Sequence, residues 1–328
     1  MRNLRFRGLG LVIVGLLLAV PGPASADASD IPGTATWYFH VDLDRMRSTD
    51  AGKGVHRWMV DEIFNDLKED TGVDVDKELD RLTAYSLEGQ GPVFLFEGDI
   101  SQTSKDRLMT MIAAEGDLKA QKSSGKSYYR FAGNGHENGD GDGDGDKARV
   151  GGGNIEIQFD SLEDEAWISM ALDRKVIVTS SEAQMKDMLK GGGKIAGSGG
   201  HKGAMLILTA EKTLLQAGMN SAAFGDSDED GHSSWDSNIL RNTEQVAFLI
   251  AAAGNKLALE AQLTTTEADM AQSLASVVRG LISLLAFSDD MDAEAIAVLQ
   301  GTKVEAKGNN LTISLAVDSE LLVSTLND

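Results

Sequence analysis

The sequence predicts an α+β protein of two related units, each a mainly antiparallel sheet with helices packed on one face. Three observations lead to this prediction. Segments with apolar residues at strand spacing are joined by short turns, which is typical of antiparallel hairpins. Amphipathic helical segments follow several of these strands. The order of strands and helices in the first half of the chain is roughly repeated in the second half.

The clearest hairpin lies in the second half of the chain. Thr243–Ala253 is a mostly apolar run, and apolar residues alternate with mostly polar ones in Leu257–Leu263. The pair Gly254-Asn255 lies between them and tolerates the positive φ angles that a two-residue hairpin turn requires. The sequence therefore predicts two antiparallel strands joined at this pair.

A long amphipathic helix is predicted to follow this hairpin. Thr264 is the expected N-cap, with Glu267 three residues later as its capping-box partner. Beyond this cap, apolar residues recur at helical spacing: Met270, Leu274, Val277, Val278, Leu281, Leu284 and Leu285. We expect these side chains to form one continuous face that lies on one side of the sheet.

The N-terminal unit is predicted to open with the strand Ala35–Leu43, which is rich in aromatic and β-branched residues, and the amphipathic helix Gly54–Lys68. Another helix, capped by Ser101 or Thr103, is expected to turn three side chains inward: Leu108, Met111 and Ile112. The other predicted elements are a short helix at Asp74–Leu79, strands at Arg81–Leu87, Val93–Glu97, Lys126–Phe131 and Asn154–Phe159, a hairpin of Ala166–Leu172 with Lys175–Thr179, and a helix at Glu182–Leu189.

The C-terminal unit is predicted to repeat much of this order. Its elements outside the hairpin and long helix are the strand Ala204–Thr209, helices at Glu211–Met219 and Ala293–Leu299, strands at Thr302–Ala306 and Leu311–Val317, and a closing helix at Ser319–Leu326. Ala35–Leu43 would correspond to Ala204–Thr209, and Val93–Glu97 to Leu257–Leu263. Residue identity between the halves is poor, so the predicted duplication depends on element order alone.

The glycine-rich segment 191–203 is predicted to be a linker between the two units. It lacks the strand and the Gly-Lys-Ser/Thr ending of a phosphate-binding loop. The N-terminal unit therefore covers residues 27–190 and the C-terminal unit residues 204–328. Each unit carries an acidic insert, at 133–153 and 220–237 respectively.

Residues 1–26 have the pattern of a Sec-type secretory signal peptide. Three arginines precede the 12-residue apolar run Leu9–Val20, and an Ala24-Ser25-Ala26 cleavage site follows. The apolar run is shorter than the roughly 20 residues needed to cross a bilayer. We expect cleavage after Ala26 and a periplasmic or secreted mature protein without a membrane span.

The composition restricts the classes of partner. The chain has 30 basic and 51 acidic residues and a net charge of −21, which becomes −24 when the three arginines of the signal peptide are removed. Such a surface repels nucleic acid and anionic lipid, and it attracts cations or basic partners. The absence of cysteine excludes disulfides and thiolate metal sites, so the mature chain depends on its core for stability.

Each acidic insert contains a D-x-D-x-D-G motif, and these motifs are the candidate metal sites. The candidate ligands are Asp140, Asp142, Asp144, Asp226, Asp228 and Asp230. Alternating carboxylates followed by glycine can surround Ca²⁺, which takes roughly six to eight oxygen ligands. Gly151 and Ser237 replace the bidentate glutamate at the last loop position, so neither motif is a complete EF-hand. The missing ligand favours solvated acidic loops, and weak calcium binding is the alternative.

The sequence contains no constellation typical of an enzyme. Its five histidines lack the spacing of zinc sites, although the acidic surroundings of His136 and His232 leave zinc there as an alternative. A G-x-S-x-G motif is absent. Asp42 and Asp44 end the first predicted strand and could act as an acid-base pair. Such residues more often cap the following turn, and we expect them to do so here.

Three segments carry a resemblance to known proteins. They are WYFHVDLDRMRSTDAGKGV at 37–55, GVDVDKELDRLT at 72–83 and TKVEAKGNNLTISLAVDSELL at 302–322. These segments look like parts of exported bacterial proteins of unassigned function with duplicated α+β units, and the resemblance spans most of the mature chain. It implies export and duplication, but its motifs are structural and imply no catalytic residue.

We therefore expect an exported envelope protein that binds or scaffolds rather than catalyses. Its partner would be an unknown envelope protein or a cation. Two alternatives stay open: a weak calcium-binding module that uses the two acidic inserts, and a hydrolase with an unrecognised site.

Overall fold

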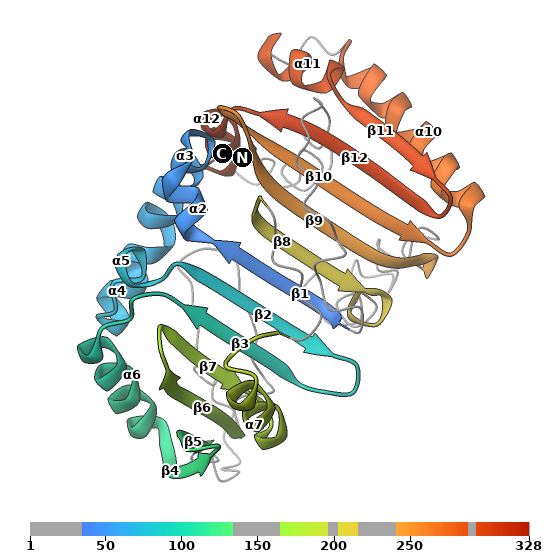
Figure 1. The fold of residues 1–328 in the computed structure, drawn as a ribbon. Helices are drawn as coiled ribbons and strands as arrows, with labels where there is room; N and C mark the ends of the chain where they lie inside the picture. Colours follow the sequence, from blue (N-terminus) through green and yellow to red (C-terminus); the bar gives the residue numbers. More distant parts are fainter. Residues whose placement is uncertain (1–34, 134–164, 196–202, 216–240, 288–292, 328) are drawn as a thin grey trace, which may run out of the picture.

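The computed structural model of the chain describes residues 35–133, 165–195, 203–215, 241–287 and 293–327. These residues are organised around one sheet of 12 strands, in the order β11-β12-β10-β9-β8-β1-β2-β3-β7-β6-β5-β4 (Figure 1). All neighbouring strands in it are antiparallel. The predicted α+β class with a mainly antiparallel sheet is confirmed.

Most strands lie close to the ranges that the sequence predicts. In chain order they are β1 (Ala35–Asp42), β2 (Arg81–Leu87), β3 (Pro92–Glu97), β4 (Gly116–Ser123), β5 (Lys126–Gly133), β6 (Glu165–Leu172), β7 (Lys175–Thr179), β8 (Ala204–Glu211), β9 (Thr243–Ala253), β10 (Lys256–Thr265), β11 (Lys303–Lys307) and β12 (Asn310–Val317). The β9–β10 hairpin turns at the predicted glycine, Gly254, whose φ of 67° is the left-handed conformation that glycine adopts without strain.

The helices are shorter and more numerous than predicted in the N-terminal part. They are α2 (Leu43–Ser48), α3 (Asp50–Met59), the π-helical segment η2 (Val60–Phe64), α4 (Asn65–Thr71), α5 (Val75–Glu78), α6 (Gln102–Glu115), α7 (Glu182–Lys190), α10 (Ala268–Leu285), α11 (Ala293–Gln300) and α12 (Ser319–Asn327). The predicted caps Ser101 and Ser181 are confirmed, because their side chains accept hydrogen bonds from the backbone N–H groups of Ser104 and Gln184.

Strand β4 is an element that the sequence does not predict. Gly116–Ser123 is strongly polar, with little of the alternation that marks a half-buried strand. It forms one edge of the sheet and pairs with β5. The charged side chains of Lys119 and Lys122 suit an edge strand, because they discourage pairing with another sheet.

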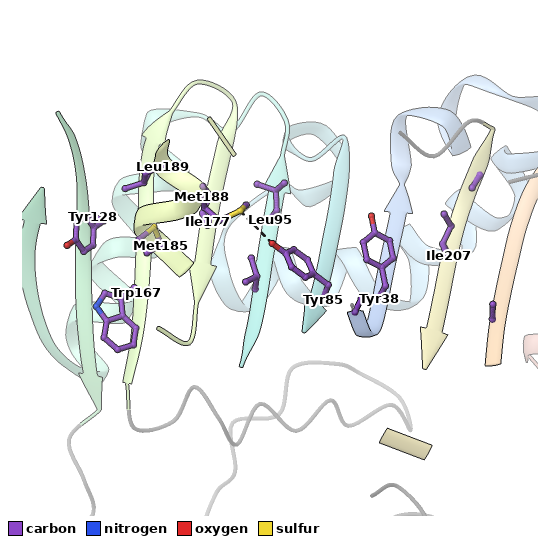
Figure 2. Packing of buried hydrophobic residues seen from close by; sticks show 14 of the residues in the cluster. Tyr38, Tyr85, Leu95, Tyr128, Trp167, Ile177, Met185, Met188, Leu189 and Ile207 are labelled. Carbon is purple, nitrogen blue, oxygen red and sulfur yellow. Dashed lines mark hydrogen bonds between the residues drawn. The ribbon is translucent and has the colours of Figure 1, made fainter. Parts of the chain in front are cut away.

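One face of the sheet packs against α7. Tyr38, Tyr85 and Ile177 are buried on this face, and Met185 and Met188 of α7 pack against the same cluster (Figure 2). The rings of Tyr38 and Tyr85 are stacked with centroids 6.3 Å apart, and the Tyr85 hydroxyl lies 3.6 Å from the Met188 sulfur. Burial of its hydroxyl raises the pKa of Tyr85 to about 12.

The opposite face packs against α2, α3 and α12. Successive residues of a strand point to opposite faces, so Val41 lies on the face away from Tyr38. It belongs to a second buried cluster with Met46 of α2 and Val55 of α3. Both faces of the sheet thus carry helices, whereas the sequence predicts helices on one face. The predicted arrangement was wrong for the N-terminal half, because strand periodicity gives two faces but does not show which helix covers each. In the C-terminal half, α10 and α12 lie on the same face of the sheet, as predicted.

Helix α10 lies against β10, β11 and β12 and forms a third cluster with them. Its predicted capping box is wrong: Thr264 continues β10 and pairs with Asn310, and Glu267 occupies the N-cap position. Because Thr264 is paired within the sheet, the helix begins later than predicted. Ala271 and Ala275 are fully buried, whereas the predicted inward face included neither of them.

Helix α6 also departs from its predicted orientation. Leu108 and Ile112 are half-buried, but Met111 is exposed. The helix contacts β4 and β5, the last two strands at one edge of the sheet. These polar strands offer little apolar surface to a helix, so the predicted inward position of Met111 was wrong.

The sheet runs without a break from one predicted unit into the other. Strand β1 pairs with β8 from Trp37 opposite Ala210 to Val41 opposite Leu206. Figure 1 shows these two strands in the middle of the sheet. The N-terminal and C-terminal parts are therefore joined through a backbone ladder as well as through the chain.

Several predicted features lie outside the described residues. They are the signal peptide 1–26, nearly all of the acidic insert 133–153, the strand Asn154–Phe159 and the acidic insert 220–237. In the described part of the chain, no helix has the length and apolar character needed to cross a membrane.

Candidate functional site

The six candidate metal ligands cannot be placed. Asp140, Asp142, Asp144, Asp226, Asp228 and Asp230 all lie outside the described residues, as do His136 and His232. Among the residues that the structure does describe, no three His, Asp or Glu side chains gather in a way that could hold a metal ion. The described part contains two other features of interest, a polar cluster and an apolar helix surface.

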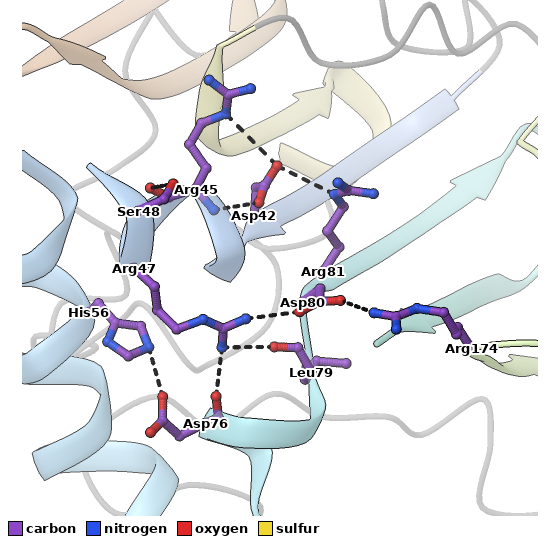
Figure 3. Close-up of polar contacts among 10 residues, drawn as sticks. All are labelled: Asp42, Arg45, Arg47, Ser48, His56, Asp76, Leu79, Asp80, Arg81 and Arg174. Carbon is purple, nitrogen blue, oxygen red and sulfur yellow. Dashed lines mark hydrogen bonds and ion pairs between the residues drawn. The ribbon is translucent and has the colours of Figure 1, made fainter. Parts of the chain in front are cut away.

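The polar cluster lies where β1 ends and β2 begins (Figure 3). We call it the Arg–Asp cluster and define it as Asp42, Arg45, Arg47, His56, Asp76, Asp80, Arg81 and Arg174. These residues come from β1, α2, α3, α5, the segment between α5 and β2, β2 itself and the β6–β7 turn. They are separated by up to 132 positions in the sequence, so no local motif could have revealed them.

Asp42 caps helix α2, whereas the sequence predicts only that it caps the turn after the first strand. Its carboxylate accepts a hydrogen bond of 2.8 Å from the backbone N–H of Arg45. The same carboxylate lies 3.4 Å from Nε of Arg81 and 3.9 Å from Nε of Arg45. Asp44 is exposed in the first turn of α2, where its negative charge favours the helix N-terminus. The predicted structural role therefore accounts for the contacts of Asp42.

Asp80 joins two distant arginines. Its carboxylate lies 3.0 Å from a terminal nitrogen of Arg47 and 2.6 Å from a terminal nitrogen of Arg174. Arg47 also donates to the backbone carbonyls of Asp76 and Leu79, at 2.6 and 3.1 Å. One guanidinium thus ties helix α2 to the segment that leads into β2. Such a fork of donors is a geometry that lysine does not reproduce.

His56 and Asp76 form the least exposed contact of the cluster. Nε2 of His56 lies 3.0 Å from Oδ1 of Asp76, an ion-pair distance, although the two groups are not aligned as a hydrogen bond. Burial lowers the pKa of His56, and the nearby charge of Arg47 acts in the same direction, while Asp76 opposes both. We therefore assign a neutral imidazole at neutral pH.

The contacts of the Arg–Asp cluster join helices to the sheet. Asp42 contacts the guanidinium groups of Arg45 and Arg81, and Asp80 contacts those of Arg47 and Arg174. These contacts explain how the helices of one face are fixed to the sheet.

The apolar surface lies on the outer side of α10. We call it the α10 ridge and define it by four exposed side chains: Val277 (57%), Leu281 (52%) and Leu284 (71%) on the helix, and Phe287 (87%) just beyond its end. The sequence predicts that Val277, Leu281 and Leu284 face the sheet, and this is wrong. Ala271, Ala275 and Ile282 take that place, because the apolar arc of this helix is wider than the surface that the sheet can cover.

The helix that carries the ridge has few charged residues. The only charged residue between Met270 and Phe287 is Arg279, and its guanidinium donates to the backbone carbonyl of Val304 on β11, at 2.6 Å. Gly280 adjoins the ridge, and a Cβ there would meet no atom within 4 Å. A contiguous exposed apolar surface on one element is typical of an interaction site. The apolar arc, about twice the usual width, was the sequence feature that could have indicated two contact surfaces.

Comparison with known proteins gives no family. No family model matches the sequence, and no curated protein matches it significantly. Among solved structures, crystal form IV of TP0453 is similar with a TM-score of 0.43 at 9% identity, covering 94% of this chain and 100% of that one. Crystal form III of TP0453 gives a TM-score of 0.41 at 9% identity, covering 94% and 98%. We draw no functional conclusion from these similarities.

Proposed function

We propose that this protein works in the cell envelope by binding or scaffolding rather than by catalysis. The observation that carries the proposal is the α10 ridge. Three large apolar side chains on α10 and Phe287 just beyond it are exposed to water, and burying a side chain of this size stabilises a complex by roughly 1.5–3 kcal/mol. These exposed side chains do not stabilise the folded monomer, but a partner that covers them would be bound more tightly.

Export to the periplasm or the medium is part of the proposal. Its support is the basic, apolar and A-x-A pattern of residues 1–26, together with a cysteine-free and strongly acidic composition. The test is N-terminal sequencing of the protein recovered from the periplasm or medium. We expect it to begin at Asp27, directly after Ala26. Recovery of the intact N-terminus in the cytoplasm would contradict export.

The binding role is tested by cross-linking in cells. A photo-reactive amino acid at Leu281 is expected to trap a discrete cross-linked species, because that side chain is half-exposed on the ridge. The same group at Gln272, exposed on the opposite side of α10, is the matched control and should trap none. Equal patterns at both positions, or no discrete species at Leu281, would contradict the proposal.

We also infer that the two halves arose by duplication. The support is the strand order, in which β1-β2-β3-β7 extends in one direction from the middle of the sheet and β8-β9-β10-β12 in the other. A helix follows β3 and another follows β10, as α6 and α10. The test is a sequence profile built from relatives of residues 35–97. We expect it to detect residues 204–263, and a profile that detects only its own half would contradict duplication.

Weak calcium binding is the second candidate function. Its support is the repeated D-x-D-x-D-G motif of the two acidic inserts. Ca²⁺ at millimolar concentration is expected to raise the melting temperature above that in EDTA, more than Mg²⁺ does, because binding to the folded state stabilises it. Replacing Asp226, Asp228 and Asp230 with Asn should reduce the rise. An unchanged rise would show that this insert does not bind.

A further inference from the structure

Helix α10 carries two parallel apolar seams. The inner seam faces the sheet and consists of Ala271, Ala275, Val278, Ile282 and Leu285. The outer seam lies one residue earlier at each step and consists of Met270, Leu274, Val277, Leu281 and Leu284. Steps of four, three, four and three residues are the heptad spacing with which one helix packs against another. In the described part of the chain, the C-terminal half of the outer seam is exposed.

We propose that the partner of this seam is a second copy of the same chain, so that the α10 ridges of two copies pack against each other around a two-fold axis near Gly280 and Leu281. This inference rests on the proposed binding function and names its partner. An interface of this type is self-complementary, because each copy contributes the same helix surface. The midpoint between Val277 and Leu284 falls at the proposed axis.

Charge is the first argument for self-association. Acidic residues make up 51 of the 328 positions, so two copies repel each other over most of their surfaces. None of the residues from Met270 to Phe287 is acidic, and the one basic residue among them, Arg279, is held at β11. Two acidic copies can therefore meet at the ridge without bringing like charges together. A basic partner would instead be attracted to the acidic surfaces.

Gly280 is the second argument. A glycine inside a helix costs roughly 0.5–1 kcal/mol relative to alanine. Its backbone here is not in the left-handed region, and a Cβ would meet no atom within 4 Å, so packing within the chain does not require glycine. At a two-fold axis, its missing side chain lets the second helix approach and leaves room for the partner's Leu281. Small residues at such crossings permit close packing of two helices.

The size of the ridge predicts a weak dimer. From Val277 to its last residue, Leu285, the helix advances about 12 Å, and its diameter with side chains is about 10–12 Å. The area that these two lengths enclose is far smaller than the roughly 800 Å² that each partner buries in a standard interface. We therefore expect a weak, reversible dimer.

The decisive experiment is sedimentation equilibrium of the purified protein from low to high micromolar concentration. Wild type should pass from monomer to dimer. Leu281→Glu should be monomeric throughout, because two new charges would face each other at the axis. Gln272→Glu adds the same charge on the opposite side of α10 and should dimerise as wild type does. Circular dichroism of both variants checks that the fold is kept.

Gly280→Ala and salt supply two further readouts. The alanine should weaken dimerisation at least tenfold while leaving the fold intact, because its Cβ has open space in the single copy. Raising the salt concentration should strengthen the dimer, since it screens repulsion between two acidic copies. Dimerisation that weakens with salt, or that Gly280→Ala leaves unchanged, would overturn the proposed interface.

The absence of native cysteine allows a direct proof of geometry. Leu281→Cys introduces a single thiol that should form an intermolecular disulfide on mild oxidation, whereas Gln272→Cys should not. A monomer at all concentrations, with no trapped dimer, would overturn self-association. If cross-linking at Leu281 in cells then yields a different protein, the binding function stands and the second copy is excluded. If it yields nothing, both proposals fail.

Discussion

At the scale of single residues, the His56–Asp76 contact is the part of the Arg–Asp cluster whose behaviour depends most on pH. The imidazole is largely removed from water, and desolvation penalises its charged form more than Asp76 supports it. The folded-state pKa therefore lies below the ordinary value of 6.5. The unfolded chain binds a proton at a higher pH than the folded chain does.

This difference predicts a pH-dependent stability. Above the ordinary pKa of His56, this residue should not make the free energy of unfolding depend on pH. As the pH drops below that value, the free energy of unfolding should fall, because His56 takes up a proton at a higher pH in the unfolded state than in the folded state. His56→Gln should flatten this fall in urea titrations between about pH 7 and 5. Parallel curves for wild type and variant would contradict the assignment of a neutral His56.

Two carboxylates with a lowered pKa act in a lower pH range than His56 does. Hydrogen bonds with Lys68 and Lys77 lower the pKa of Asp74 below its ordinary value of 3.8, and a hydrogen bond from Tyr128 lowers that of Glu182 below 4.5. A lowered carboxyl pKa stabilises the folded state above the unfolded value and ceases to do so as the pH falls through the folded value. These groups therefore do not obscure the window assigned to His56.

At the scale of elements, α7 shows how a short helix is fixed by one cap and one apolar side. The hydroxyl of Ser181 accepts from the backbone N–H of Gln184 at 3.3 Å and begins the helix. Met185 and Leu189 are fully buried one turn apart, and Lys186 remains at the surface. The buried side chains, rather than the helix alone, secure its position on the sheet.

Met185→Ala should destabilise the protein by about 2–5 kcal/mol, because it leaves a cavity between α7 and the sheet. Lys186→Ala is the neighbouring control. It removes a 3.1 Å surface ion pair with Glu182 and should change stability by less than about 1 kcal/mol. Urea unfolding of both variants measures the difference. Similar losses in the two would show that α7 does not pack as described.

Helix α10 illustrates the opposite case, an element with more apolar surface than its own chain can cover. Its inner seam fits the space above β10, β11 and β12, while Leu284 on its outer seam is 71% exposed. The four-and-three spacing that identifies a helix face is the same for both seams. A helix of this kind is held by one contact and remains available for another.

At the scale of the whole molecule, the continuous sheet joins the two halves into one packed body. The β1–β8 pairing joins them through five residue pairs at the middle of the sheet. The cluster on the α2–α3 face contains Val41 and Val55 from the first half together with Leu257 and Leu315 from the second. Neither half can lose its structure without exposing buried side chains of the other.

We therefore predict a single cooperative unfolding transition. Met185→Ala in the first half and Leu257→Ala in the second should each lower the same melting temperature in calorimetry, because both side chains are fully buried in one packed body. Wild type serves as the reference for the number of transitions. Two transitions, each shifted by one substitution only, would show that the halves unfold independently.

The sequence by itself determined the local elements. The apolar run of β9, the alternation in β10, the glycine at their turn, and the helix caps Ser101 and Ser181 were predicted correctly, and Asp42 was expected to cap the turn after β1. Each depends on residues within a few positions of one another, through side-chain periodicity or a hydrogen bond to the nearby backbone. Polar β4 escaped prediction because its alternation is weak.

Only the tertiary structure decided which surfaces meet. The pairing of β1 with β8, the meeting of Arg47, Asp80 and Arg174, and the exposure of Leu284 depend on groups that are distant in the chain. Helical spacing marks an apolar arc, but the width of the neighbouring sheet decides how much of that arc is buried. The candidate interaction surface is the part left over, so it became visible only when the packing was known.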